Sequence, residues 1–299
     1  MKTQTAIIFG VGGQDGFYLS KFLKSKNISC LGISRSSGDI LGDIGDFTFV
    51  KNVIIEHQPN YIFHLAAISS TKHFTLFENQ NSICNGTINI LESTRLFNPE
   101  AKVFISGSAL QFKNVGLPID ESTPFDASSS YSVSRINSIY FARYYKKIFN
   151  LKIYIGYFFN HDSVLRSENH VNQKIIQTVI RINAGSNEKL AIGNMDVKKE
   201  FNFAGDVIEA VWILINQNKV FEVVIGSGQA FAIRNWVEYC FKKINKNWED
   251  YIVINENFEP DYDILVSNPA LINSLGWKPK TSMEQLADLM LGDEIFNSC

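Results

Sequence analysis

A glycine-rich segment near the start of the chain constrains its fold more than any other feature. The apolar run Ala6-Ile7-Ile8-Phe9 leads directly into Gly10, and glycine recurs at Gly13 and Gly16. A short apolar run of this kind predicts a buried parallel strand, and the apolar spacing after it predicts a helix. Glycines at such a turn let the backbone approach a pyrophosphate, and the helix N-terminus offers N–H groups to an anion. The segment therefore predicts a dinucleotide site, against the alternative of an ordinary glycine-rich turn.

Strand and helix patterns alternate over roughly the first 150 residues, which predicts a doubly wound parallel sheet of the α/β class. The loops that follow the strands of such a sheet share one edge, where ligands bind. The expected strands are residues 6–9, 30–33, 61–67, 102–106 and 151–159, and the expected helices are residues 19–26, 53–57, 82–97 and 131–149.

The pattern loosens after Asn160, which predicts a second, smaller lobe interleaved with the first. We assign residues 1–160, with about 201–230, to a dinucleotide-binding domain, and residues 161–200 and 231–299 to a substrate-binding lobe. The elements expected after Asn160 are helices at 171–184, from 233 onward and at 282–291, a strand at 252–254, and strand and helix patterns at 202–217 and 222–226.

Composition and charge argue against several classes of partner. The chain has 299 residues, of which 28 are basic and 30 acidic, so nothing favours nucleic acid or an anionic membrane surface. No apolar run is long enough to span a bilayer, and the first residues lack a signal-peptide pattern, so we expect a cytoplasmic protein. Four widely spaced cysteines without metal-ligand spacing predict reduced thiols and no metal site: Cys30, Cys84, Cys240 and Cys299.

The end of the second expected strand bears on the choice of dinucleotide. An NAD site usually has an acidic residue here for the ribose hydroxyls, whereas this chain reads Ser34-Arg35-Ser36-Ser37. An arginine among hydroxyl groups suits a 2′-phosphate, which favours NADP(H) over NAD(H); the alternative is a solvated loop arginine. Asp43 is a candidate acceptor for the adenine amino group, or else an exposed loop acid.

Tyr131 and Arg135 form a candidate acid–base pair. They are four residues apart, so on a helix they share one face about one turn apart. A fixed cation favours the ionised form of a nearby phenol, which brings the phenol closer to acid–base work near neutral pH. The alternative is an unremarkable pair on the helix surface.

Several motifs in one order resemble the extended short-chain dehydrogenase/reductases that modify nucleotide sugars. The resemblance is nearest to the branch of GDP-mannose 4,6-dehydratases and GDP-4-keto-6-deoxymannose reductases, and it covers nearly the whole chain. It implies a Rossmann fold with a smaller C-terminal substrate lobe, a nicotinamide cofactor, a nucleotide-sugar substrate, and a homodimer or homotetramer. The motifs are residues 12–19 (GGQDGFYL), His64-Leu65-Ala66-Ala67, the segment 131–135, residues 159–163 (FNHDS) and residues 275–279 (LGWKP).

The resemblance also implies roles for individual residues. Tyr131 matches the acid–base tyrosine, Arg135 stands at the position of the lysine that holds the nicotinamide ribose, and Ser108 matches the hydroxyl that binds the sugar 4-oxygen. The implied cofactor residues are Gly10, Gly13, Gln14, Asp15, Gly16, Arg35, Ser36, Asp43, Leu65, Ala66 and Ala67, together with Tyr131 and Arg135. The implied substrate residues are Ser108, Asn160, Arg166, Lys174 and Lys199, although each basic residue among them could instead be a solvated surface charge.

Departures from the family pattern shape the expected activity. Ala109 stands where the dehydratases carry the glutamate that removes the C5 proton, so elimination of water is disfavoured. We therefore expect an NADPH-dependent reductase of the C4 ketone of a nucleotide-linked 4-keto-6-deoxy sugar, in the biosynthesis of surface-glycan sugars. The alternatives are a C4 epimerase, a C4 dehydrogenase or a 4,6-dehydratase. Arg135 in place of lysine, and the lack of an arginine in residues 258–261, leave a non-catalytic nucleotide-sugar-binding protein as another alternative.

Overall fold

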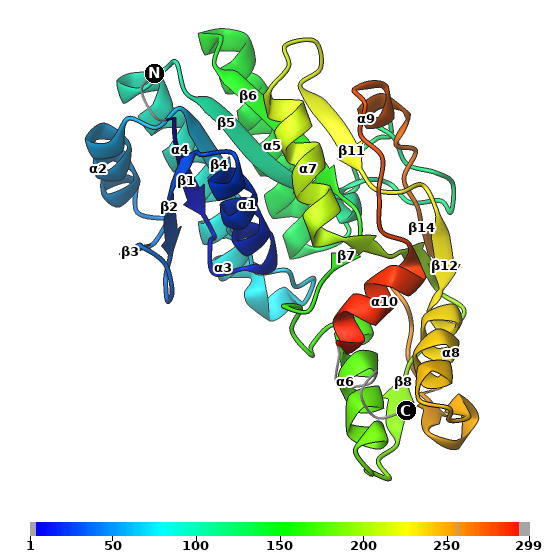
Figure 1. The fold of residues 1–299 in the computed structure, drawn as a ribbon. Coiled ribbons are helices and arrows are strands. Elements are labelled where there is room, and N and C mark those ends of the chain that lie inside the picture. The colour runs from blue at the N-terminus through cyan, green and yellow to red at the C-terminus, as the bar shows by residue number, and fades with distance from the viewer. Residues whose placement is uncertain (1–3, 256, 293–299) are drawn as a thin grey trace.

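A parallel sheet of seven strands forms the centre of the structure, a computed structural model that describes residues 4–255 and 257–292. Its strands are β1 (Thr5–Phe9), β2 (Ser29–Ser34), β3 (Ile40–Leu41), β4 (Tyr61–His64), β5 (Lys102–Ser108), β6 (Lys152–Phe158) and β11 (Glu222–Ile225). Their order is β11-β6-β5-β4-β1-β2-β3, and all neighbours are parallel (Figure 1). The predicted doubly wound α/β sheet is confirmed.

Helices cover both faces of this sheet because its strands are apolar on both sides. In β1, Ile7 and Phe9 belong to one layer of the core, and Ala6 and Ile8 belong to the other. Successive side chains of a strand point to opposite faces, so a buried parallel strand is apolar throughout. The first layer packs against α2 (Phe47–His57), α4 (Gly86–Phe97) and α5 (Ser130–Phe149), and the second against α1 (Gln14–Ser25), α7 (Ala204–Ile215) and α9 (Ala270–Ser274) (Figure 1).

A smaller lobe with its own apolar core lies beyond the carboxyl edge of the sheet (Figure 1). Its core joins three amphipathic helices, α6 (Val171–Asn183), α8 (Ile233–Lys243) and α10 (Met283–Leu291), around the fully buried Trp236. Short strands complete this region: β7 (His161–Asp162), β8 (Leu190–Ile192), β9 (Lys198–Glu200), β10 (Asn202–Phe203), β12 (Ala230–Ala232), β13 (Ile252–Ile254) and β14 (Ile264–Leu265).

Glu200 at the end of β9 joins three segments of this lobe. Its carboxylate accepts hydrogen bonds from the backbone N–H groups of Ser227 (2.5 Å), Gly228 (3.2 Å) and Ser267 (2.6 Å), and from the amide of Asn202 (2.9 Å). The carboxylate is fully buried, and so many donors offset the cost of removing its charge from water.

The sequence patterns located the long elements and the short strand at 252–254, which is β13, but missed most of the other short elements. The helix expected at 82–97 begins as a π-helical turn (Gln80–Asn85) and continues as α4, and the helix expected at 19–26 begins earlier, directly at the glycine loop. The remaining short helices are η1 (His73–Thr75), α3 (Leu76–Asn79), η3 (Ala109–Gln111) and η4 (Trp248–Asp250). These helices and the remaining two- or three-residue strands are too short to show a period in the sequence.

The structure bears on the expected reduced thiols and on the expected lack of a membrane-spanning segment. Cys30, Cys84 and Cys240 are free thiols, and Cys299 lies outside the described residues. Within residues 4–255 and 257–292, no helix combines the length and the apolar character that crossing a membrane requires.

Candidate active site

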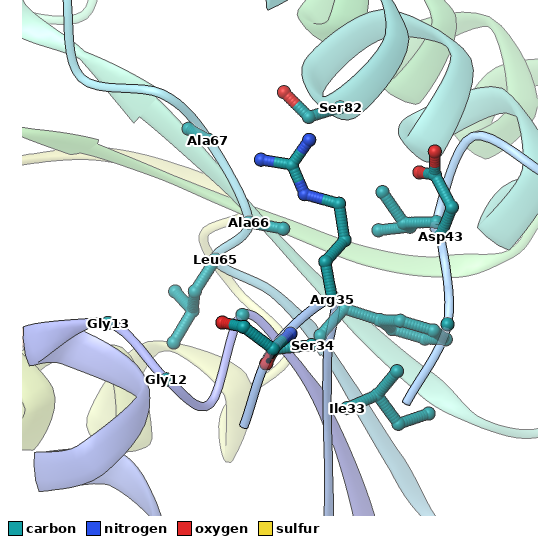
Figure 2. A pocket seen from close by; sticks show the side chains of 15 residues that line it. Gly12, Gly13, Ile33, Ser34, Arg35, Asp43, Leu65, Ala66, Ala67 and Ser82 are labelled. Atoms are coloured by element: carbon teal, nitrogen blue, oxygen red, sulfur yellow. Dashed lines mark hydrogen bonds between the residues drawn. The ribbon is translucent and has the colours of Figure 1, made fainter. Parts of the chain in front are cut away.

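A pocket opens at the carboxyl edge of the sheet, where β1, β2 and β4 end (Figure 2). Its lining comes from the loops after these strands, as expected for a ligand site in a doubly wound fold. Most of the residues predicted to bind the cofactor meet here, whereas the side chains of Gln14 and Asp15 turn toward the second lobe. The lining residues are Phe9, Gly10, Gly12, Gly13, Ile33, Ser34, Arg35, Ser36, Gly42, Asp43, Ile44, Leu65, Ala66, Ala67 and Ser82.

The three glycines of the motif differ in what the absence of a side chain permits. Gly10 has φ +99°, and a Cβ there would lie 2.6 Å from the backbone nitrogen of Ala66. A Cβ on Gly16 would collide with the carbonyl oxygen of Gly10, so this glycine permits the close packing of α1 on β1. Gly13 meets only one protein atom within 4 Å, at 3.5 Å, so the fold itself leaves room for a side chain there. Room at the N-cap of α1 is what a bound pyrophosphate requires.

Arg35 and Asp43 lie on the rim of the pocket. Figure 2 shows the Arg35 side chain extending across the pocket toward Ser82, with Asp43 to one side. The Asp43 carboxylate accepts hydrogen bonds from the amide of Asn81 (3.1 Å) and the N–H of Gly45 (2.9 Å). Asp39, the other acid of this loop, accepts a bond from the N–H of Gly32 at 2.7 Å. Both carboxylates are thus held by protein donors, and Arg35 is the cation at the end of β2.

Tyr131 and Arg135 form a buried hydrogen-bonded pair beside this pocket. The Arg135 Nε donates to the Tyr131 hydroxyl at 3.1 Å. Tyr131 is 6% exposed and Arg135 is 5% exposed. Arg135 Nη1 donates to the carbonyl oxygen of Ser106 and to its hydroxyl (2.9 Å), and that hydroxyl donates to the carbonyl oxygen of His64 (2.9 Å). The guanidinium is therefore fixed between the phenol and the end of β5. The hydrogen bonds of Arg135 to the described residues run through Nε and Nη1.

The charge of Arg135 also acts on His64, whose ring lies in the same buried region. Burial, assisted by Arg135, lowers the pKa of His64 to about 3, so this ring is neutral at physiological pH. Its Nε2 lies 3.3 Å from the carbonyl oxygen of Ile83 and donates to it. The neutral ring adds no second charge, so Arg135 is the cation next to the Tyr131 hydroxyl.

The end of β5 supplies a hydroxyl but no carboxylate. Ser108 is 8% exposed and caps the short η3 helix, where its hydroxyl accepts from the N–H of Leu110 at 3.3 Å. Ala109, the next residue, is 2% exposed and offers only a methyl group. The position at which the resemblance expects a C5 base therefore cannot accept a proton.

A polar cluster between the sheet edge and the small lobe contains three of the predicted substrate residues. Asn160 is partly buried, and its Oδ1 has no hydrogen-bond partner among the described residues. Arg166 Nε pairs with Asp162 Oδ1 at 3.1 Å, and Asp162 Oδ2 accepts from the amide of Asn172 at 2.6 Å. Burial lowers the pKa of Lys199 to about 8, against the attraction of Asp162. A buried cation of this kind, next to unpaired amide oxygens, suits an anionic and hydroxyl-rich ligand.

Lys174 does not join this cluster. It lies on the exposed face of α6 and donates to the carbonyl oxygen of Ala191 at 3.3 Å. Its neighbour Gln173 is buried, and Gln173 Oε1 has no partner among the described residues. Tyr262 also borders the cluster, where burial raises the pKa of its hydroxyl to about 12 and the Asn160 side chain opposes the rise. The sequence analysis missed Gln173 and Tyr262 because nothing local distinguishes them from other polar residues.

The buried His161 and the partly buried Asp15 form a second pair, between α1 and β7. His161 Nε2 lies 2.8 Å from Asp15 Oδ1, and His161 Nδ1 lies 2.7 Å from the carbonyl oxygen of Phe159. Burial acts to lower the pKa of His161, but the Asp15 carboxylate outweighs it and raises the pKa above its ordinary value. Burial likewise acts to raise the pKa of Asp15, but His161 outweighs it and lowers the pKa. Each member of the pair therefore favours the charged form of the other.

Comparison with known proteins identifies the family. The family model for GDP-mannose 4,6 dehydratase matches residues 39–290 of this chain. The chain belongs to the GDP-mannose 4,6 dehydratase family. GDP-mannose 4,6 dehydratase 1 of Arabidopsis thaliana is 28% identical over 324 residues, which cover 97% of this chain and 89% of that protein. The resemblance predicted from the motifs is confirmed at the level of the family.

Two solved structures illustrate how widely the fold is shared. A UDP-glucose 4-epimerase with UDP-glucose from Thermotoga maritima superposes with a TM-score of 0.87 at 18% identity, over 98% of this chain and 99% of that one. RMD from Pseudomonas aeruginosa complexed with NADPH superposes with a TM-score of 0.85 at 18% identity, over 99% and 100%. Both comparisons concern the fold, and members of this dehydratase family share it with an epimerase.

We predict that the stability contributed by the Asp15–His161 pair depends on pH. Because the pKa of His161 is raised above 6.5, its contribution is fully present below that pH and is lost as pH rises through the folded-state pKa. His161→Gln should lower the free energy of unfolding by about 1 to 3 kcal/mol at pH 6 and by less at pH 9. Urea unfolding followed by circular dichroism at both pH values measures the difference.

His170 provides the contrasting variant for that measurement. Burial lowers its pKa to about 4, so a neutral ring is favoured in the folded protein and the protein loses stability as pH falls below 6.5. The stability of His170→Gln relative to the wild type should therefore increase as pH falls, whereas that of His161→Gln should decrease. Equal losses for His161→Gln at pH 6 and pH 9 would contradict an ionised Asp15–His161 pair.

Proposed function

We propose that this chain is an NADP(H)-dependent oxidoreductase that reduces the C4 ketone of a nucleotide-linked 4-keto-6-deoxy sugar. The observation that carries the proposal is the 3.1 Å hydrogen bond from Arg135 Nε to the Tyr131 hydroxyl, buried beside the pocket at the carboxyl edge of the sheet. This bond fixes the orientation of the phenol, whose hydroxyl can then exchange a proton with a sugar oxygen.

Each residue of the site would have a separate role in this reaction. The bound dinucleotide supplies the hydride. Ser108 donates to the C4 oxygen and polarises the ketone, and Tyr131 delivers a proton to that oxygen as negative charge develops on it. Arg135 holds the phenol in place through Nε, and its Nη2 would donate to the ribose of the dinucleotide. The cluster around Asn160 and Lys199 binds the nucleotide-sugar portion of the substrate.

Ala109 supports reduction over elimination. Loss of water across C5 and C6 needs a base to remove the C5 proton, and a buried methyl group cannot serve as one. Reduction of a C4 ketone needs only a hydride donor, an acid and a polarising hydroxyl. The second candidate is a GDP-mannose 4,6-dehydratase, which membership in that family favours. A C4 epimerase or a C4 dehydrogenase would use the same tyrosine and serine.

We also propose NADP(H) as the dinucleotide. Arg35 extends into the pocket from the end of β2, and the nearby Asp39 is already bonded to the backbone of Gly32. A guanidinium at this point favours a 2′-phosphate over a free hydroxyl. The structurally similar RMD was solved with NADPH. A homodimer or homotetramer stays a prediction from the resemblance, and the exposed Tyr140 and Tyr144 on α5 are surface available to it. A cytoplasmic location stays a prediction from the sequence patterns.

The first test compares two substrates. With NADPH and a GDP-linked 4-keto-6-deoxy sugar, we expect the absorbance of the reduced nicotinamide to fall with product formation, and Tyr131→Phe serves as the inactive control. With GDP-mannose in D₂O and no added oxidant, we expect neither a 4-keto product nor deuterium at C5 by NMR. Deuterium at C5 would establish the dehydratase instead. Tight dinucleotide binding without turnover of 4-keto sugars on any of several nucleotides would favour the non-catalytic alternative.

The second test concerns the Tyr131–Arg135 pair. Tyr131→Phe should reduce turnover by about 10² to 10⁴-fold because the general acid is lost, while dinucleotide binding stays nearly intact. Arg135→Lys should keep or raise activity, since lysine supplies the same charge at the family position. The matched control is Arg143→Lys. Arg143 pairs with Glu222 at an N–O distance of 2.8 Å, and this pair does not line the pocket. An unchanged rate in Tyr131→Phe would show that another group is the acid.

The third test concerns the choice of dinucleotide. Arg35→Ala should raise KM for NADPH by about 10- to 100-fold, because charge-assisted bonds to the 2′-phosphate are lost, and should leave KM for NADH unchanged. Arg95→Ala, which removes a cation paired with Glu92 on α4, is the control and should alter neither constant. A parallel rise of both KM values in Arg35→Ala would argue against recognition of a 2′-phosphate.

A further inference from the structure

His161 joins the first helix of the sheet domain to the short strand that leads into the small lobe. Its ring is 9% exposed, and both ring nitrogens face atoms that can only accept hydrogen bonds. Nδ1 faces the carbonyl oxygen of Phe159 at 2.7 Å, and Nε2 faces the carboxylate of Asp15 at 2.8 Å. A neutral imidazole has one N–H and could satisfy only one of these acceptors. The ring therefore carries both protons and a full positive charge.

Asp15 occupies a position where the helix favours a negative charge but where that charge would repel a bound phosphate. It is the second residue of α1, in the first helical turn, where the helix dipole favours an anion. Gly13 is the N-cap residue of this helix, and it has no side chain to accept hydrogen bonds from the free N–H groups of the first turn. A pyrophosphate bound there would lie within about one helical turn of the Asp15 carboxylate and would be repelled by it.

The surroundings hold Asp15 and His161 in a fixed geometry. The Gln14 amide donates to Asp15 Oδ1 and to the carbonyl oxygen of His161, both at 3.3 Å, and its oxygen accepts from the Ser163 hydroxyl at 2.8 Å. The nearest further charge is Arg166, which acts on both members of the pair and is itself paired with Asp162. His161 is thus the only cation among the described residues in direct contact with Asp15.

We propose that the protonated His161 neutralises Asp15 and thereby allows the first turn of α1 to accept the pyrophosphate of the dinucleotide. This inference rests on the proposed dinucleotide site and assigns His161 as a positioning residue that acts on that site through Asp15. It also explains why an acid can stand inside a phosphate-binding turn. The charge that makes the turn usable comes from β7, at the entrance to the small lobe.

Three variants test the charge argument by NADPH binding alone, without turnover. His161→Gln keeps a donor for Asp15 but removes the positive charge, and should weaken NADPH binding at least about tenfold, as expected for one uncompensated charge about one helical turn from a dianion at a water-like dielectric constant of about 80. Asp15→Asn should bind NADPH at least as tightly as the wild type. The double variant Asp15→Asn/His161→Gln should recover wild-type affinity. Calorimetric titration gives the three dissociation constants.

The recovery in the double variant separates charge from structure. If His161 acted only by holding the fold together, removing Asp15 as well would leave NADPH binding as weak as in His161→Gln, and the inference would be overturned. Equal affinities of His161→Gln and the wild type would also overturn it. His57→Gln, a partly buried histidine at the end of α2, is the control and should not change the affinity. A wild type that binds no NADPH would instead overturn the proposed dinucleotide, and this inference with it.

Discussion

The parallel pairing of β1 with β2 and β4 is the constraint on which the rest of the site depends. It brings the carboxyl ends of three strands to one edge, so that Gly10, Ser34 and Leu65 begin loops around a common pocket. The approach is so close that Gly10 tolerates no Cβ against Ala66. Helices on both faces then remove the sheet from water, and only its edge remains open to a ligand.

The chemistry next to this pocket follows from one buried cation. Arg135 is anchored by the carbonyl and hydroxyl of Ser106 and donates to Tyr131, so its charge is directed at the phenol rather than at solvent. An arginine is permanently charged and has a planar fork of donors, so it can bind the strand end and the phenol simultaneously. Lysine, the residue that the family resemblance places here, has one nitrogen for the same task. In the proposed reduction, Tyr131 would deliver its proton to the C4 oxygen, and Ala109 offers no base for the competing elimination.

A two-residue strand, β7, connects the two halves of the site. His161 and Asp162 are adjacent, so their side chains point in opposite directions. His161 reaches back to Asp15 in the first turn of α1, whereas Asp162 faces Asn172 and Arg166 at the small lobe. Charge at the glycine loop and charge at the polar cluster of the small lobe are therefore balanced by consecutive residues of one strand.

The sequence by itself determined the architecture and the local pairs. Apolar runs and glycine spacing predicted the doubly wound sheet, and the interval of four residues predicted that Tyr131 and Arg135 would meet, because both signals are carried by neighbours along the chain. Only the tertiary structure decided which distant groups meet. It paired Asp15 with His161, turned Gln173 inward and left Lys174 in solvent. Such contacts join residues far apart in sequence or depend on the rotation of a helix against another lobe, and no local pattern encodes either.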